Sequence, residues 1–230
     1  MIGRIAATTV VLLLASAGAA MAGTIVVGSA RSDLVAVACR LVAAHPAVTG
    51  AEFAGSRSRG EHHELSDWDV SVQTSDFAAV ARDMHALVAP LEPIGEQWEP
   101  MGHFPVYQVM LRGPTKLEYL FLDESQDALP TPEPGPDTLA AINTHFWDWT
   151  WWLITKEAAG RRDLVAEHMP QMHAHLLHPL GIAAVPESLD AAIAAFVARR
   201  DALEHEYGIS VPRALEDEVQ AGYRRVRQSP

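Results

Sequence analysis

The spacing of apolar positions changes along this chain, and the change predicts two kinds of structure. Between residues 32 and 122, stretches with helical spacing alternate with short runs typical of strands. Helices are predicted at 32–44 and 76–89, and strands at 48–54, 69–73, 104–111 and 116–122. A typical turn sequence, Arg112-Gly113-Pro114-Thr115, separates the last two strands, so we expect them to form a hairpin.

The second half of the chain has helical spacing throughout. Residues 127–136 contain four prolines and predict a linker. Helices are then predicted at about 138–158, 161–178, 187–207 and 212–227. Trp147 and Trp151 lie four residues apart, on one face of the first of these helices, and are expected in a core. The pattern indicates an α+β fold, in which residues 23–126 form a small domain with a mixed sheet and flanking helices, and residues 137–230 form a C-terminal helical domain.

The chemistry that the sequence indicates is concentrated between the first two predicted strands. Gly55-Ser56 follows the first strand, and Asp67-Trp68-Asp69 opens the second. Alternate residues of a strand share a face, so Asp67 and Asp69 are expected to project together, about 7 Å apart. Two carboxylates at that spacing suit Mg²⁺ held jointly with substrate phosphates, and a Gly-Ser turn can offer N–H groups and a hydroxyl to those phosphates. The stretch predicts phosphoryl or nucleotidyl transfer.

This arrangement resembles the signature of the DNA polymerase beta-type nucleotidyltransferase superfamily, over about residues 48–123. The resemblance implies a third carboxylate on a later strand, and Glu118 is the best match. The chain departs from the commonest pattern at two positions: the third acid is Glu instead of Asp, and the bulky Trp68 separates the aspartates. Glu at the third position is known in the aminoglycoside adenylyltransferase branch, which the chain resembles.

The resemblance implies a Mg²⁺-dependent enzyme that transfers AMP from ATP to a hydroxyl of a small, aminoglycoside-like cation. The implied catalytic and metal-binding residues are Asp67, Asp69 and Glu118. The implied nucleotide-binding residues are Gly55, Ser56, Arg57 and Lys156. Two alternatives stay open: a nucleotidyltransferase of the antitoxin type that AMPylates proteins, and a catalytically degenerate binding module.

The composition of the chain narrows the range of possible functions and ligands. The 230 residues include 17 Lys and Arg against 29 Asp and Glu, a formal net charge of −12. This balance argues against non-specific nucleic-acid binding and favours a cationic acceptor. A single cysteine, Cys39, excludes an intramolecular disulfide and a Cys-based zinc cluster, and its apolar neighbours predict a buried thiol. The 11 histidines meet no fixed zinc spacing, and no P-loop or dinucleotide-binding glycine motif is present.

The N-terminus points to a different cellular location from the rest of the chain. Residues 1–22 comprise a short basic start, an apolar run and an Ala20-Met21-Ala22 segment that resembles a cleavage site. The segment is a signal peptide, a short membrane-associated helix, or an over-extended gene start with Met21 as the true first residue. The run is too short for a stable membrane span. Because ATP is a cytoplasmic substrate, we favour the over-extended start and a cytoplasmic location, and export stays open.

Overall fold

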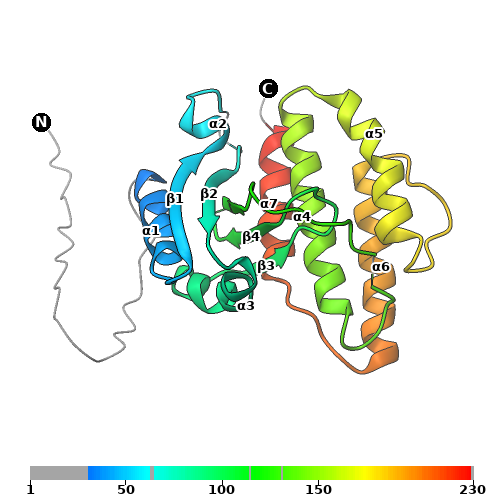
Figure 1. Ribbon diagram of the computed structural model, residues 1–230. Helices are drawn as coiled ribbons and strands as arrows, with labels where there is room; N and C mark the ends of the chain where they lie inside the picture. Colours follow the sequence, from blue (N-terminus) through cyan, green and yellow to red (C-terminus); the bar gives the residue numbers. More distant parts are fainter. Residues whose placement is uncertain (1–30, 63–64, 114, 131, 229–230) are drawn as a thin grey trace, which may run out of the picture.

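The computed structural model describes residues 31–62, 65–113, 115–130 and 132–228 (Figure 1). The expected N-terminal extension, residues 1–22, lies outside this part of the chain. A mixed sheet with flanking helices is followed by a helical region, which confirms the predicted α+β fold class. In the described part, no helix is both long enough and apolar enough to cross a membrane.

The sheet has five strands in the order β1-β2-β5-β4-β3. Their bounds are β1 Val48–Ala54, β2 Trp68–Thr74, β3 Gly95–Trp98, β4 Val106–Leu111 and β5 Thr115–Leu120. β2 and β5 are parallel, and the other neighbouring pairs are antiparallel. β4 and β5 form the predicted hairpin. The parallel pair lies at the centre of the sheet, so residues of β2 and β5 that share a face lie side by side.

The two faces of the sheet differ in character. Helices α1 (Arg31–Ala43) and α3 (Phe77–Val88) cover one face (Figure 1). Leu117 and Tyr119 of β5 are fully buried in the core beneath them, and the Tyr119 hydroxyl donates a hydrogen bond to a carbonyl oxygen of α1 at 3.2 Å. Glu118 lies between these two residues in the strand and therefore faces the opposite side of the sheet.

The opposite side of the sheet meets the helical region. The helices of this region are α4 Leu139–Ala158, α5 Arg162–Met172, the π-helical turn His173–Leu177, α6 Leu189–Tyr207 and α7 Ala214–Gln228. α4 packs against β3 and also against α5, α6 and α7 (Figure 1). Trp147 and Trp151 are 0% and 4% exposed in the core of these helices, as predicted.

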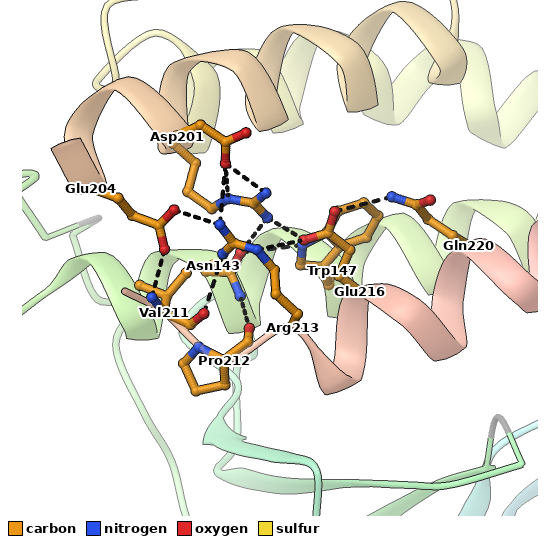
Figure 2. A network of polar contacts seen from close by, with 10 residues as sticks. Asn143, Trp147, Asp201, Glu204, Val211, Pro212, Arg213, Glu216 and Gln220 are labelled. Carbon is orange, nitrogen blue, oxygen red and sulfur yellow. Dashed lines mark hydrogen bonds and ion pairs between the residues drawn. The ribbon is translucent and has the colours of Figure 1, made fainter. Parts of the chain in front are cut away.

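A buried ion-pair network ties three of these helices together (Figure 2). Arg200 of α6 is only 2% exposed, and it donates to Asn143 of α4 at 3.2 Å and pairs with Glu216 of α7. Arg213, just before α7, pairs with Glu204 of α6. Because a buried charge without a partner is costly, these contacts fix the positions of α6 and α7 relative to α4.

The structure differs from the sequence prediction in several places. β3 was not predicted, because its four residues contain no clear alternation of apolar and polar positions. A short helix, α2 (Gly55–Ser58), stands where a turn and loop were expected. Asp67 precedes the first residue of β2 and does not belong to the strand. Cys39 is half-buried against the core, not fully buried.

Candidate active site

Gly55 lies directly against Asp69. Ala54, the last residue of β1, is the register partner of Asp69 in β2, so the chain leaves β1 beside this carboxylate. Gly55 has a φ of 71°, and a Cβ atom built on it would stand 1.6 Å from the Asp69 Oδ2 atom. Only glycine combines this left-handed backbone with so close an approach. The predicted Gly-Ser turn and the aspartate that follows it are therefore adjacent in space.

Asp69 and Glu118 are register partners across the parallel strands β2 and β5. Burial raises the pKa of Asp69 to about 6, and the charge of Glu118 adds to the rise. Asp67 is the residue before β2, and its pKa is raised to about 7 by burial and by the charges of Glu118, Asp148 and Asp69. The three predicted carboxylates thus lie close enough to destabilise one another's charged forms.

The three carboxylates are not a tight cluster. Within the residues that the structure describes, the set of three whose ligand atoms all lie within 4.8 Å of one another is Glu99, His145 and Asp148. The donors at Asp67, Asp69 and Glu118 are all carboxylate oxygens, which suit Mg²⁺, and their mutual repulsion is the condition that a bound cation relieves. These residues therefore fit a magnesium ion in their chemistry.

Lys116 is a residue of this site that sequence reasoning did not identify. It is 4% exposed, and its Nζ atom lies 2.9 Å from Glu118 Oε1 and 2.8 Å from Asp148 Oδ1. Burial acts to lower the pKa of Lys116, but the charges of Asp148, Glu118 and Asp67 outweigh burial and hold the pKa well above its ordinary value. The sequence did contain a signal for this residue, because Lys116 is two residues before Glu118 and so shares its face of the strand.

The pairing with Lys116 sets the charge of Glu118. Burial acts to raise the pKa of Glu118, but Lys116 and a hydrogen bond from Gln108 outweigh burial and lower it. Gln108 Nε2 donates to Glu118 Oε1 at 3.1 Å, and Gln97 Nε2 donates to Gln108 Oε1 at 2.8 Å and to Asp148 Oδ2 at 3.1 Å. Glu118 is therefore ionised at neutral pH and is held in position by neighbours on β3, β4 and β5.

The predicted nucleotide-binding residues surround these carboxylates. Ser56 is half-buried in α2. Arg57 donates to the Ser66 carbonyl oxygen at 2.8 Å, and its guanidinium group lies 4.3 Å from the centre of the Trp68 ring; its charge acts to lower the pKa of Asp69. Lys156 lies in the last turn of α4, 4.8 Å above the Trp152 ring, and its charge acts to lower the pKa of Glu118. The charges of Arg57 and Lys156 therefore both influence the carboxylates, whereas Ser56 is placed only by its position in α2.

Trp68 does not fill the space between the aspartates. Its side chain is 8% exposed and belongs to the core under α1 and α3, on the side of the sheet away from Asp69. It stacks on Phe53 of β1 with 5.9 Å between the ring centroids. The bulky residue in this position is therefore compatible with an open carboxylate site.

A second polar cluster adjoins the first through Asp148. Glu99 follows β3, and His145 and Asp148 lie three residues apart on α4. Burial raises the pKa of Glu99, with the charge of Asp148 adding to the rise, whereas burial lowers the pKa of His145. The imidazole is therefore largely neutral at neutral pH. Sequence reasoning did not identify this cluster, because the 11 histidines meet no fixed zinc spacing.

The comparisons with known proteins give remote structural likenesses. No protein-family model matches the chain, and no curated protein matches it in sequence. An aminoglycoside 6-adenyltransferase from Bacillus subtilis aligns over 84% of this chain and 97% of its own, with 12% identity and a TM-score of 0.32. The polymerase core of TRAMP, an RNA surveillance complex, aligns over 57% of this chain and 42% of its own, with 12% identity and a TM-score of 0.35. Because both TM-scores are below 0.5, these likenesses carry no argument about function, and the proposal below rests on the geometry of the site.

Proposed function

We propose that the chain is a nucleotidyltransferase that transfers AMP from ATP to a hydroxyl group of a small molecule. The observation that carries the proposal is the contact between the Gly55 turn and Asp69, with Glu118 beside Asp69 on the next strand. A backbone turn that can receive phosphate groups stands next to carboxylates that can hold a metal ion. Phosphoryl chemistry needs these two parts side by side.

The carboxylates would provide the metal site. Asp67, Asp69 and Glu118 would hold Mg²⁺, and the bound ion would stabilise negative charge on the phosphate oxygens and orient them. The unusually high pKa values of Asp67 and Asp69, about 7 and about 6, reflect buried negative charge that lacks a full counter-charge. A dication at this position would supply that charge.

The turn and two basic residues would hold the triphosphate. Gly55 brings the turn directly against Asp69, and the Ser56 hydroxyl lies one residue further along. Arg57 and Lys156 approach the carboxylates from opposite parts of the chain, one from α2 and one from α4. Their positive charges would offset part of the negative charge that ATP brings into an acidic site.

The transfer would be a single displacement at the α-phosphorus. The acceptor oxygen forms a bond to phosphorus, the bond between the α-phosphorus and the bridging oxygen breaks, and pyrophosphate leaves. The hydroxyl proton passes to a carboxylate of the site. Glu118 is ionised at neutral pH because Lys116 pairs with it, so it can accept this proton.

The acceptor would be a hydroxylated cation. The chain carries a formal net charge of −12. A site with one sign of charge attracts ligands of the opposite sign.

Mass spectrometry of products tests the proposal. The purified protein is incubated with ATP, Mg²⁺ and a panel of hydroxylated amines that includes aminoglycosides. We expect one acceptor to gain the mass of AMP, with pyrophosphate released. If AMP is found on protein side chains instead, the enzyme is of the antitoxin type. If ATP binds and no group is transferred, the chain is a binding module.

A further inference from the structure

We propose that Glu99, His145 and Asp148 form a second metal site, for a divalent transition-metal ion such as Zn²⁺ or Mn²⁺. The three side chains each bring one ligand atom to within 4.8 Å of the other two. The site shares no ligand with Asp67, Asp69 and Glu118, although it adjoins them through Asp148, and the inference does not depend on AMP transfer.

The three ligand atoms lie within 4.8 Å of one another, which is a somewhat wider spread than around a bound ion. Ligand atoms around a tetrahedral zinc ion with bonds of about 2.0–2.2 Å are about 3.3–3.6 Å apart. Side-chain movements on the order of 1 Å would close the cluster to that spacing. His145 and Asp148 lie three residues apart on α4, so they share one face of the helix.

Glu99 is held firmly toward this helix face. Its backbone N–H donates to the Val106 carbonyl oxygen at 2.8 Å, and its own carbonyl oxygen accepts a hydrogen bond from Gln126 at 2.6 Å. The Met101 N–H donates to Glu99 Oε1 at 2.9 Å. These three contacts fix both the backbone and the carboxylate, which a preorganised metal ligand requires.

Gln97 leaves one acceptor of the cluster without a full hydrogen bond. Its Nε2 atom has two N–H groups but three acceptors nearby: Gln108 Oε1 at 2.8 Å, Asp148 Oδ2 at 3.1 Å and His145 Nδ1 at 3.3 Å. The orientation of the Gln97 amide follows from that of Gln108. Because Gln108 donates its own N–H group to Glu118, its Oε1 atom accepts from Gln97. In the imidazole tautomer that carries its proton on Nε2, His145 Nδ1 is the acceptor with the longest of the three contacts to Gln97.

Asp148 can bind an ion without releasing its present partners. Lys116 contacts Oδ1 and Gln97 donates to Oδ2. Each carboxylate oxygen has two lone pairs, so each keeps one for a metal ion.

The charge balance also favours a cation here. Five carboxylates interact with the buried ammonium group of Lys116: Asp67, Asp69, Glu99, Glu118 and Asp148. If Mg²⁺ were bound at the catalytic carboxylates, Glu99 and Asp148 would still have only Lys116 as a counter-charge, and Lys116 also pairs with Glu118. A second cation at the cluster would offset this remaining negative charge.

The three donor atoms of the cluster indicate which class of metal ion it would bind. One imidazole nitrogen with two carboxylates favours a transition-metal ion over Mg²⁺ or Ca²⁺, which prefer oxygen alone. A cavity of about 310 Å³, lined by His145 with Gln97, Trp98 and Pro100, reaches one of the three ligands of the cluster. The bound ion would join the β3 edge of the sheet to α4.

Calorimetric titration of metal-stripped, untagged protein with Zn²⁺ and with Mn²⁺ tests the inference, with Mg²⁺ in excess throughout. We expect one equivalent of at least one of these ions to bind the wild type and to raise its melting temperature. His145→Gln and Glu99→Gln should each weaken binding at least tenfold. His168→Gln serves as the matched control, because His168 contacts Trp149 and Trp152 nearby but lies outside the cluster.

Asp69→Asn separates the two sites. This variant should bind the transition-metal ion as the wild type does, even where it has lost AMP transfer. The inference fails if neither ion binds, if Glu99→Gln and His145→Gln both bind like the wild type, or if Asp69→Asn removes binding. Circular dichroism of each variant establishes that it is folded, and Glu99→Gln, which preserves side-chain shape, decides the result if His145→Gln does not fold.

Discussion

Lys116 of β5 forms an ion pair with Asp148 of α4 at 2.8 Å, and this contact joins the sheet to the helical region. The same ammonium group pairs with Glu118 at 2.9 Å. Lys116 therefore has two functions in the ion-free protein: it links two parts of the fold, and it neutralises a carboxylate that the proposed metal site needs. A bound metal ion and Lys116 would share Glu118.

Replacing Lys116 should destabilise the protein strongly. Lys116→Met keeps an unbranched side chain, one atom shorter, but leaves Glu118 and Asp148 buried without their counter-charge, at a cost of about 3–5 kcal/mol. Urea denaturation measures the loss. Lys156→Met is the control, because Lys156 is partly exposed and its contact with Trp152 contributes only about 0.5–1 kcal/mol. If Lys116→Met unfolds at the same urea concentration as the wild type, the ion pairs of Lys116 do not contribute to the free energy of unfolding.

The sequence predicted the sheet and its polar face well, because these depend on local alternation. The predicted strand 48–54 coincides with β1, and Glu118 faces away from Leu117 and Tyr119 as its strand phase required. The burial of Lys116 was not predictable in the same way, since a lysine in a strand is ordinarily exposed. Its burial depends on Asp148, which reaches it from a helix far along the chain.

Long-range pairing also explains the other omissions. β3 is identifiable only by its pairing with β4, and the cluster of Glu99 with His145 requires α4 to pack beside β3. The roles of Gly55, Ser56, Arg57 and Lys156, and the domain limits at 126 and 137, stay predictions. Gly55 is the position at which the structure adds most support, because its contact with Asp69 crosses between two strands.

Gly55→Ala should abolish most of the transfer activity. The added methyl group would meet Asp69 Oδ2 at 1.6 Å, so the carboxylate has to move, and misplacement by about 1 Å can cost about a hundredfold in rate. Gly60→Ala is the matched control: its φ is 73°, close to that of Gly55, but a Cβ atom there meets nothing within 4 Å. The rate of AMP transfer under saturating ATP is measured for both. Equal losses would mean that backbone strain, and not Asp69, causes the effect.

The stability of the ion-free protein should fall as pH rises from about 4 to about 7. The pKa of Asp67 is 3.8 when unperturbed and about 7 in the folded protein, so the folded state binds the proton more tightly and loses this advantage as the carboxyl ionises. Asp67→Asn removes the part of this fall that Asp67 contributes, while Asp69, with a pKa of about 6, still contributes its own part. The variant should melt a few degrees above the wild type at pH 8 (on the order of 1 kcal/mol or more) and close to it at pH 4. A difference in melting temperature that does not change with pH would contradict the assignment.

The affinity for Mg²⁺ should rise across the same range of pH. Asp67 and Asp69, with pKa values of about 7 and about 6, hold protons at pH 5.5 that a metal ion has to displace. Calorimetry in two buffers of different ionisation enthalpy should show proton release on binding at pH 6.5 and little release at pH 8.5. Binding of Mg²⁺ with no proton release at pH 6.5 would place the ion away from these two carboxylates.

Asp69→Asn should remove AMP transfer and leave the fold intact. The substitution changes the volume little and removes one charge from the metal site, and it also removes a repulsion on Glu118, so the melting temperature at pH 8 should be unchanged or higher. Asp76→Asn is the control, because Asp76 caps α3 through a hydrogen bond that asparagine can also accept. Turnover and thermal melting are measured for both variants. If Asp69 binds the catalytic metal ion, the loss of this carboxylate ligand should lower the rate by orders of magnitude. A nearly normal turnover in Asp69→Asn would therefore show that Asp69 binds no catalytic metal ion.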